Sequence, residues 1–141
     1  MNRMKNKRAF SLMEILITVI ILGILASFSI PQYAKSIDKS HERDIVTQLR
    51  AIHAANEVYR ASANEYLQDG GSALNLSAIN SNLNISIVPN GATYTYSSTS
   101  ASSYQAQASW DGSTLRVTEG SLDNTNPCCV GGGCLISIGS C

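Results

Sequence analysis

The sequence has 141 residues with 10 basic and 10 acidic side chains, a length that suits one folded domain and one terminal segment. The charges are unevenly placed, because Arg3, Lys5, Lys7 and Arg8 lie close to the N-terminus and the remainder carries 6 basic against 10 acidic side chains. This acidic remainder excludes a broad cationic surface for nucleic acid.

The first element along the chain is an apolar run from Phe10 to Ile30, which follows the basic residues and ends at Pro31. A helix of this length can cross the ~30 Å hydrocarbon core of a bilayer, and the basic flank predicts a cytoplasmic N-terminus. Glu14 lies inside the run, where a carboxylate costs ~2.5–3.5 kcal/mol on insertion scales, so a function and a partner are expected for it. An ordinary secretory signal peptide has a shorter apolar region without an acid, and an uncut membrane anchor leaves Glu14 unexplained.

The segment Lys7–Glu14, with the sequence KRAFSLME, resembles the prepilin cleavage and methylation motif of type IV pilins and type II secretion pseudopilins. The shared features are a short basic leader, a small residue before the cut, an aromatic first mature residue and a glutamate four places later. Gly23 and the segment Ile30–Tyr33 also match the family's pattern. The chain departs from that pattern at Ala9, where glycine is usual.

The resemblance implies that residues 1–9 are a leader, which a prepilin peptidase removes between Ala9 and Phe10 before it methylates the new amine of Phe10. The ammonium of Phe10 would then lie one helical turn from Glu14. We expect the carboxylate to direct assembly by pairing with the ammonium of a neighbouring subunit, since a polar group in an apolar interface fixes the register of its partners.

Two residues are expected to weaken the membrane helix. Gly23 has a low helix propensity, and Pro31 lacks a backbone donor. The resemblance implies that the stretch between Gly23 and Pro31 loosens when subunits pack into a filament, and a simple kink at Pro31 is the alternative.

An amphipathic helix is predicted to continue the first over residues 32–69, because this segment contains neither glycine nor proline and its apolar residues recur at helical spacing. These apolar residues include Ile45, Leu49, Ile52, Tyr59 and Tyr66. The pair Gly70-Gly71 predicts the end of the helix.

A mixed-charge patch at Asp38–Asp44 is interpreted as a solvated face, with charge pairing between subunits as the alternative. His41 and His53 are interpreted as solvated or half-buried residues.

The sequence period changes to two beyond Ile85, which predicts an antiparallel meander. The expected strands are Ile85–Val88, Ala92–Ser98, Tyr104–Trp110 and Thr114–Thr118. Pro89-Asn90-Gly91 and Asp111-Gly112 are the turn signals, and Gly71–Leu83 is expected to hold a short helical turn. The fold class is therefore α+β, a long N-terminal helix packed on a four-stranded antiparallel sheet, with the first half of the helix embedded in the membrane. This arrangement is type IV pilin-like. Its expected parts are a leader (residues 1–9), a transmembrane and assembly helix (10–31), an amphipathic helix that continues it (32–69), and a globular β domain with a disulfide-bonded C-terminal segment (70–141).

The four cysteines are clustered near the C-terminus, at Cys128, Cys129, Cys134 and Cys141. The predicted orientation places this end outside the cytoplasm, where disulfides form. Because adjacent cysteines seldom bond to each other, Cys128 and Cys129 are expected to pair with Cys134 and Cys141 in one of two arrangements. The spacing fits a zinc site poorly. The segment Leu135–Ile138 is expected to add an edge strand.

No constellation of residues supports catalysis, a cofactor or a metal site, so the sequence predicts a structural protein that is not an enzyme. The resemblance implies a type IV prepilin, which is inserted once in the bacterial inner membrane and polymerises through its N-terminal helix into a cell-surface filament. The expected partners are copies of the chain, membrane lipid, the prepilin peptidase, and the inner-membrane assembly platform with its ATPase. The alternatives are a pseudopilin, which forms a periplasmic filament in type II secretion, and a minor or tip pilin acting in adhesion or DNA uptake.

Overall fold

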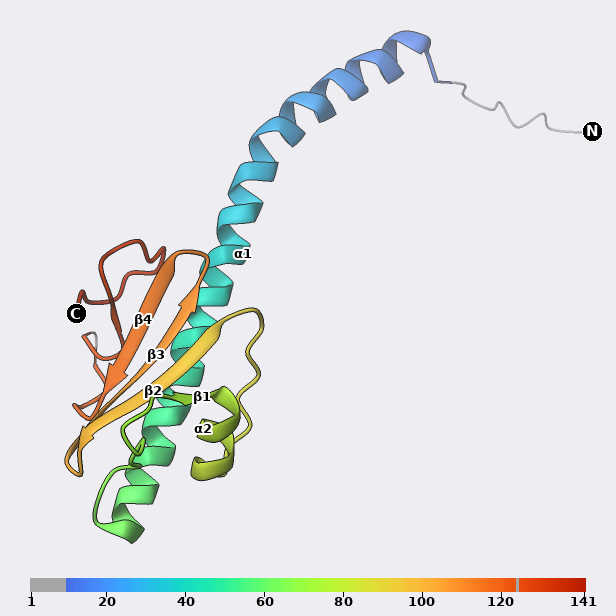
Figure 1. The fold of residues 1–141 in the computed structure, drawn as a ribbon. Helices are drawn as coiled ribbons and strands as arrows, with labels where there is room; N and C mark the ends of the chain where they lie inside the picture. The colour runs from blue at the N-terminus through green and yellow to red at the C-terminus, as the bar shows by residue number, and fades with distance from the viewer. Residues whose placement is uncertain (1–9, 124) are drawn as a thin grey trace, which may run out of the picture. The chain divides into compact units, whose positions relative to one another are not determined.

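The computed structural model describes residues 10–123 and 125–141, so the predicted leader and its cleavage-site residue Ala9 lie outside the described residues. The chain divides into two compact units between Ile37 and Asp38. A single helix, α1 (Leu12–Ala63), runs through both units (Figure 1). The second unit adds the short helix α2 (Leu76–Leu83) and one β-sheet.

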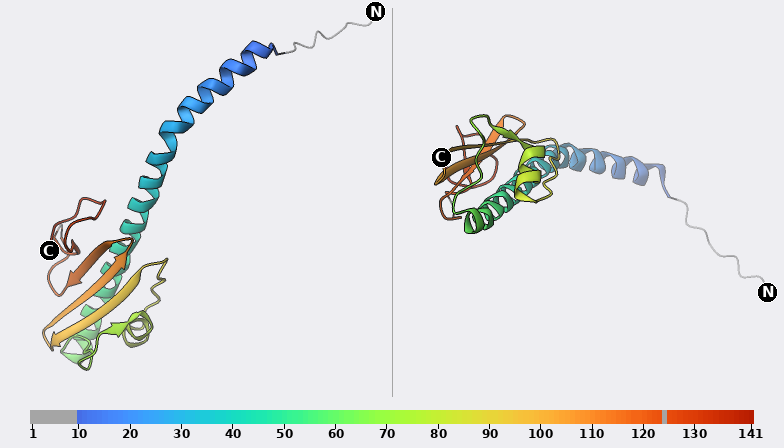
Figure 2. Two further views of the ribbon diagram at one scale, coloured as in Figure 1. Left: turned by 45° about the horizontal axis from the view of Figure 1, so that its top comes forward. Right: turned by 60° about the horizontal axis from the view of Figure 1, so that its bottom comes forward.

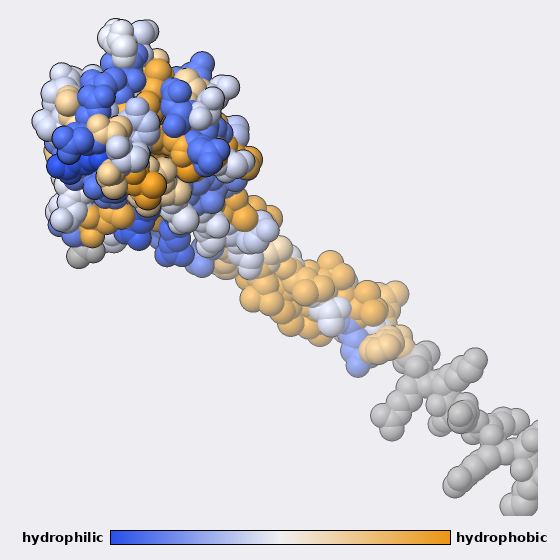
Figure 3. Space-filling view, turned by 90° about the horizontal axis from the view of Figure 1, so that it is seen from below, coloured by the Kyte–Doolittle hydropathy of each residue, from blue (hydrophilic) through white to orange (hydrophobic). Residues whose placement is uncertain are grey.

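The first unit presents apolar side chains to its surroundings. Phe10 is 80% exposed, Leu16 is 48% exposed and Leu25 is 59% exposed. No residue in the most apolar window of α1 is buried, and α1 is long and apolar enough to cross a membrane by its length and composition. Figure 3 shows this segment as a mostly apolar surface interrupted by a small hydrophilic patch.

Helix α1 ends earlier than the sequence predicts. The expected helix continues to Asp69, whereas α1 ends at Ala63. The residue after it, Asn64, has a φ of 62°, in the left-handed region that asparagine tolerates, and its N–H donates to Arg60 O at 2.8 Å. The chain leaves the helix axis here, which allows Tyr66 and Leu67 to turn into the core, where both are buried.

The sheet has five antiparallel strands in the order β1-β2-β3-β4-β5, one more than the sequence predicts. These strands are β1 (Leu74–Asn75), β2 (Thr93–Ser100), β3 (Ser103–Trp110), β4 (Ser113–Thr118) and β5 (Cys128–Cys129). The three long strands form the predicted meander, which Figure 2 shows from two further directions. Asp111 and Gly112 make the predicted tight turn between β3 and β4, both with positive φ, at 45° and 80°.

The prediction of a first strand at Ile85–Val88 is wrong. This segment has no strand partner, because the side chain of Asn80 takes the place of one: its Oδ1 accepts from Ile87 N at 2.9 Å and its Nδ2 donates to Ile87 O at 3.0 Å. The predicted helical turn before it is confirmed as α2, which begins after the N-cap Asn75, whose side chain accepts from Ala78 N.

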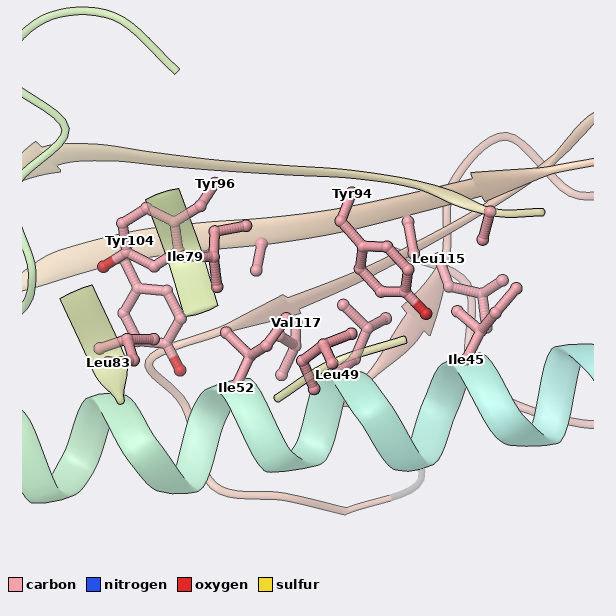
Figure 4. Packing of buried hydrophobic residues seen from close by; sticks show 14 of the residues in the cluster. Ile45, Leu49, Ile52, Ile79, Leu83, Tyr94, Tyr96, Tyr104, Leu115 and Val117 are labelled. Atoms are coloured by element: carbon pink, nitrogen blue, oxygen red, sulfur yellow. The ribbon is translucent and has the colours of Figure 1, made fainter. Parts of the chain in front are cut away.

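The core of the second unit lies between α1 and one face of the sheet. Figure 4 shows Ile45, Leu49 and Ile52 of α1 pointing toward the side chains of the strands. Their partners on the sheet include Tyr94, Tyr96, Tyr104, Leu115 and Val117. Alternate residues of β4 are buried, as expected for a strand with one face against the core. Burying each large apolar side chain stabilises the fold by roughly 1.5–3 kcal/mol.

Both edges of the sheet are very short strands. Strand β1 pairs only with Tyr96 and Thr95 of β2. Beyond it, the segment that follows α1 meets the end of β2 and the turn after it: Asp69 Oδ2 accepts from Ser98 N at 3.1 Å, and Tyr66 N donates to Ala101 O at 2.9 Å. At the other edge, β5 pairs with Leu115 and Arg116 of β4.

Candidate functional site

The N-terminus of α1 is closed by a reciprocal pair of side-chain hydrogen bonds. The Ser11 N–H donates to Glu14 Oε2 at 2.9 Å, and the Met13 N–H donates to Ser11 Oγ at 3.3 Å. This is a capping box, which satisfies backbone donors that a helix N-terminus leaves free. The described chain therefore gives Glu14 a partner in its own helix, which the sequence analysis did not predict although the Ser-x-x-Glu spacing was a signal for it.

The residues around this cap form an apolar surface. A shallow groove is lined by Phe10, Leu12, Ile15, Leu16, Val19 and Ile20. The carboxylate of Glu14 is the only ionisable group on the described part of the chain between Phe10 and Gln32. A single charge at the edge of a wide apolar surface can align a partner, because any other register would leave the charge unpaired in a medium of low dielectric constant.

The two residues expected to loosen the helix both lie within α1, which continues through Gly23 and Pro31. A Cβ built on Gly23 would meet no atom within 4 Å, so nothing in this chain requires a glycine there for close packing. The role of the stretch between them in assembly therefore stays a prediction.

A second carboxylate, Glu42, lies in the charge patch that the sequence analysis interpreted as a solvated face. That interpretation is wrong for Glu42, which is 0% exposed. Its Oε1 accepts from Ser113 Oγ at 3.0 Å, and its Oε2 accepts from Leu135 N at 2.7 Å and from Ile136 N at 2.9 Å. Glu42 therefore fastens the C-terminal segment to α1 and β4.

The same patch holds Asp44 against a loop of the second unit. Its Oδ2 accepts from Asn90 Nδ2 at 2.9 Å and from Gln48 Nε2 at 2.9 Å. Gln48 in turn accepts from the Tyr94 hydroxyl at 2.6 Å. Burial, together with the charge of Asp44, raises the pKa of Tyr94 to about 12. These contacts use the acids of the patch within one chain.

The four cysteines form two disulfides, Cys128–Cys141 and Cys129–Cys134. This is one of the two arrangements that the sequence left open. Backbone bonds run alongside the disulfides, since Cys141 N donates to Cys129 O at 3.0 Å and Cys129 N donates to Gly139 O at 2.8 Å. The predicted edge strand at Leu135–Ile138 is wrong, because the N–H groups of Leu135 and Ile136 bond to the Glu42 carboxylate instead of a neighbouring strand.

The two histidines serve the packing of the second unit. His41 stacks on Trp110 with ring centroids 4.9 Å apart. His53 is buried, and its Nδ1 lies 2.6 Å from the Tyr104 hydroxyl and 3.1 Å from Thr118 O. Burial raises the pKa of the Tyr104 hydroxyl far above its usual range. Within residues 10–123 and 125–141, no group of three His, Cys, Asp or Glu residues could hold a metal ion.

Comparison with known families identifies the N-terminal segment. Residues 4–30 match the model described as the prokaryotic N-terminal methylation motif. The match contains Phe10, Glu14 and Gly23, together with the apolar run.

Several known proteins resemble part of the chain, over 61 to 66 residues. The type II secretion system core protein G of Vibrio cholerae is 33% identical over 66 residues, which are 47% of this chain and 45% of that protein. The core protein G of Klebsiella pneumoniae is 32% identical over 63 residues, which are 45% of each chain. The type IV major pilin protein PilA of Myxococcus xanthus is 34% identical over 61 residues, 43% of this chain and 28% of that protein.

The matched region spans less than half the length of each of these relatives. The fold is the α+β arrangement of a long N-terminal helix on an antiparallel sheet, as in pilins. The chain thus carries the prokaryotic N-terminal methylation motif, and over less than half of its length it is a homologue of type II secretion core proteins G and of a type IV major pilin.

Proposed function

We propose that the chain is a prepilin-type subunit, which is cut after Ala9 and polymerises through residues 10–31 into a helical filament of the type IV pilus class. One observation carries the proposal, namely that no residue in the most apolar window of α1 is buried. Exposed side chains of this size are covered in a stable state by lipid or by other protein, and identical helices from neighbouring subunits provide such a cover.

Glu14 is proposed to exchange partners during assembly. Before assembly the capping box gives the carboxylate a hydrogen bond inside its own chain, which lowers the cost of holding an acid in lipid. Removal of residues 1–9 creates an ammonium at Phe10, and the carboxylate of one subunit pairs with the ammonium of the next. The pair is stronger between subunits in the apolar filament interior than in water, because the dielectric constant is low there.

The proposed processing of the chain and its location in the membrane follow from the N-terminal methylation motif. A prepilin peptidase removes the leader and methylates Phe10, and the subunit waits in the inner membrane with its N-terminus in the cytoplasm. An assembly platform with its ATPase then extracts it into the filament. In this proposal the stretch between Gly23 and Pro31 loosens on packing. The chain acts as a substrate and building block, not as an enzyme, and it uses no metal or cofactor.

The second unit is proposed to form the filament surface. The carboxylates of Glu42 and Asp44 are already engaged within the chain, so the interface between subunits is assigned mainly to the apolar helix. The disulfides protect the C-terminal loop outside the cytoplasm.

The test is intact mass spectrometry of the native protein from sheared surface material and from the membrane fraction. The proposal expects a mass that begins at methylated Phe10 and corresponds to two disulfides, enriched in the sheared material. An uncut chain beginning at Met1 in both fractions would contradict it.

A second candidate, a pseudopilin of a type II secretion system, is favoured by the relatives that carry the name core protein G. It uses the same processing and the same helix, and differs in where the filament is. The same experiment separates the two functions, since a pseudopilin would give the processed mass in the cell envelope and little in the sheared material.

A further inference from the structure

The outward face of the sheet carries a polar groove with one cation in it. The groove has a volume of about 360 Å³, within the range of small-molecule sites, which is roughly 300–1,000 Å³. It crosses the ends of β2, β3 and β4 on the side opposite the core. Its lining includes Ser97, Thr99, Gln105, Arg116, Thr118 and Glu119.

Arg116 is the unusual residue of this groove. It lies in β4 opposite Gln107 of β3 and Cys128 of β5, so strands on both sides hold its backbone. Its Nε is buried and has no hydrogen-bond partner. Across the residues that the structure describes, the Arg116 side chain also makes no ion pair. A buried unpaired N–H on a charged group is costly, and each such group calls for an explanation, of which a bound ion is one.

The groups around Arg116 are arranged in register across the sheet. Gln105 lies opposite Thr118 and also opposite Ser97, and its Nε2 donates to Ser97 Oγ at 3.1 Å. Glu119 approaches from the end of β4, where its Oε2 accepts from Tyr104 N at 3.4 Å. The groove therefore offers one guanidinium, one carboxylate and several hydroxyl and amide groups on rigid strands.

This set of groups selects among possible ligands. A guanidinium binds a carboxylate or a phosphate with two parallel hydrogen bonds. The neighbouring carboxylate of Glu119 makes the groove neutral overall, which disfavours a phosphate dianion and tolerates a single carboxylate. The hydroxyl and amide side chains match a ligand that carries many hydroxyl groups.

We propose that this groove binds the carboxylate of an acidic saccharide, with Arg116 paired to the carboxylate and Gln105, Thr118 and Glu119 bonded to sugar hydroxyls. The inference goes beyond the filament role and does not depend on it, because the groove lies within one chain. Tyr104 also lines the groove, but its ring is only 3% exposed and stacks on Tyr96, so it offers little ring surface to a sugar and each single site is expected to be weak.

The test uses the full mature chain in detergent micelles, titrated with trigalacturonate and followed by NMR chemical shifts. The matched probes are the neutral galactose trimer, acetate and inorganic phosphate. The proposal expects saturable binding of trigalacturonate, weaker binding of the neutral trimer and of acetate, and shifts concentrated at residues of β3 and β4 beside the groove.

Two variants locate the site. Arg116→Gln keeps the length of the side chain but removes its charge, and should weaken binding by about tenfold or more. Arg50→Gln removes an exposed cation on α1, outside the groove, and should change the affinity less than about twofold. Gln105→Leu is a second variant for the case that Arg116→Gln does not fold, and it too should weaken binding. Undiminished binding by Arg116→Gln or Gln105→Leu, no saturable binding by the parent chain, or tighter binding of phosphate would each overturn the proposal.

Discussion

The same helix presents leucines in two different environments. Leu16, in the first unit, is 48% exposed, whereas Leu49, in the second unit, is 0% exposed and lies in the core against the sheet. The second unit buries an apolar core and bonds the carboxylates of Glu42 and Asp44 within the chain, whereas the first unit leaves its large apolar side chains exposed and bonds Glu14 in the cap. The difference indicates that one end of α1 is stabilised by this chain and the other by something outside it.

The strongest test of that difference is Glu14→Ala, which should abolish incorporation into filaments while leaving cleavage after Ala9 intact. The substitution removes the charge that aligns neighbouring subunits and leaves the apolar surface in place. Shearing and immunoblotting would detect it as processed protein confined to the membrane fraction. Ser11→Ala is the control, since it removes only the other half of the capping box, at a cost of ~1 kcal/mol, and should still assemble. Normal amounts of Glu14→Ala filaments would exclude the role given to this carboxylate.

The two leucines give a direct measure of the same contrast. Leu49→Ala should lower the free energy of unfolding of the second unit by roughly 2–5 kcal/mol, because it leaves a cavity between α1 and the sheet. Leu16→Ala should leave that free energy unchanged, because Leu16 has no part in the core. Urea denaturation of the mature chain in micelles, followed by tryptophan fluorescence of Trp110, would measure both. Equal losses for the two variants would show that the units do not differ as described.

Glu42 tests whether hydrogen bonds to a buried carboxylate hold the C-terminal loop of the second unit. Glu42→Gln should lower the free energy of unfolding by about 1.5–3 kcal/mol, the value of hydrogen bonds to a charged acceptor. It should also speed reduction of the disulfides by dithiothreitol, because Leu135 and Ile136 lose part of their anchor. Arg43→Ala, at an exposed neighbouring position, should change stability by less than about 0.5 kcal/mol. A Glu42→Gln chain as stable as Arg43→Ala would contradict this role.

The smallest expected effect is a loss of stability in alkali. The folded chain raises the pKa of Tyr94 from 10.0 to about 12, so the folded state keeps this proton after the unfolded state has lost it. The stability contributed by this group is therefore complete below about pH 10 and is lost as the pH rises toward 12. Tyr94→Phe should make the fall in stability between these pH values shallower than in the parent chain. Thermal melts at a series of alkaline pH values would show it, and parallel curves would contradict it.

Much of this architecture could be predicted from local pattern. The apolar run, the meander after Ala92 and the turn at Asp111-Gly112 each depend on neighbouring residues, and the structure confirms them. The failures have a different physical origin. At Ile85–Val88 the backbone bonds to the side chain of Asn80 instead of a neighbouring strand. At Leu135–Ile138 it bonds to the side chain of Glu42, which is far away in the sequence.

One missed signal was available for Glu42. The buried stripe of Ile45, Leu49 and Ile52 has helical spacing, and one step back along it is Glu42 while one step forward is Asn56. Both are 0% exposed, and Asn56 bonds to the Tyr96 hydroxyl at 2.8 Å and to Leu67 N at 3.1 Å. A polar residue in register with an apolar stripe therefore predicts a buried hydrogen-bonding side chain, but only the fold identifies its partners.

The short strands at the edges of the sheet bear on misassembly. A long unpaired edge would let identical chains, brought close together, pair strand to strand and aggregate. Here β1 and β5 have two residues each, and Asp69 and Gln68 occupy backbone groups near the end of β2 that β1 does not reach. A protein that is crowded against copies of itself thus offers very little template for amyloid-like growth, so ordered association is left to the apolar helix.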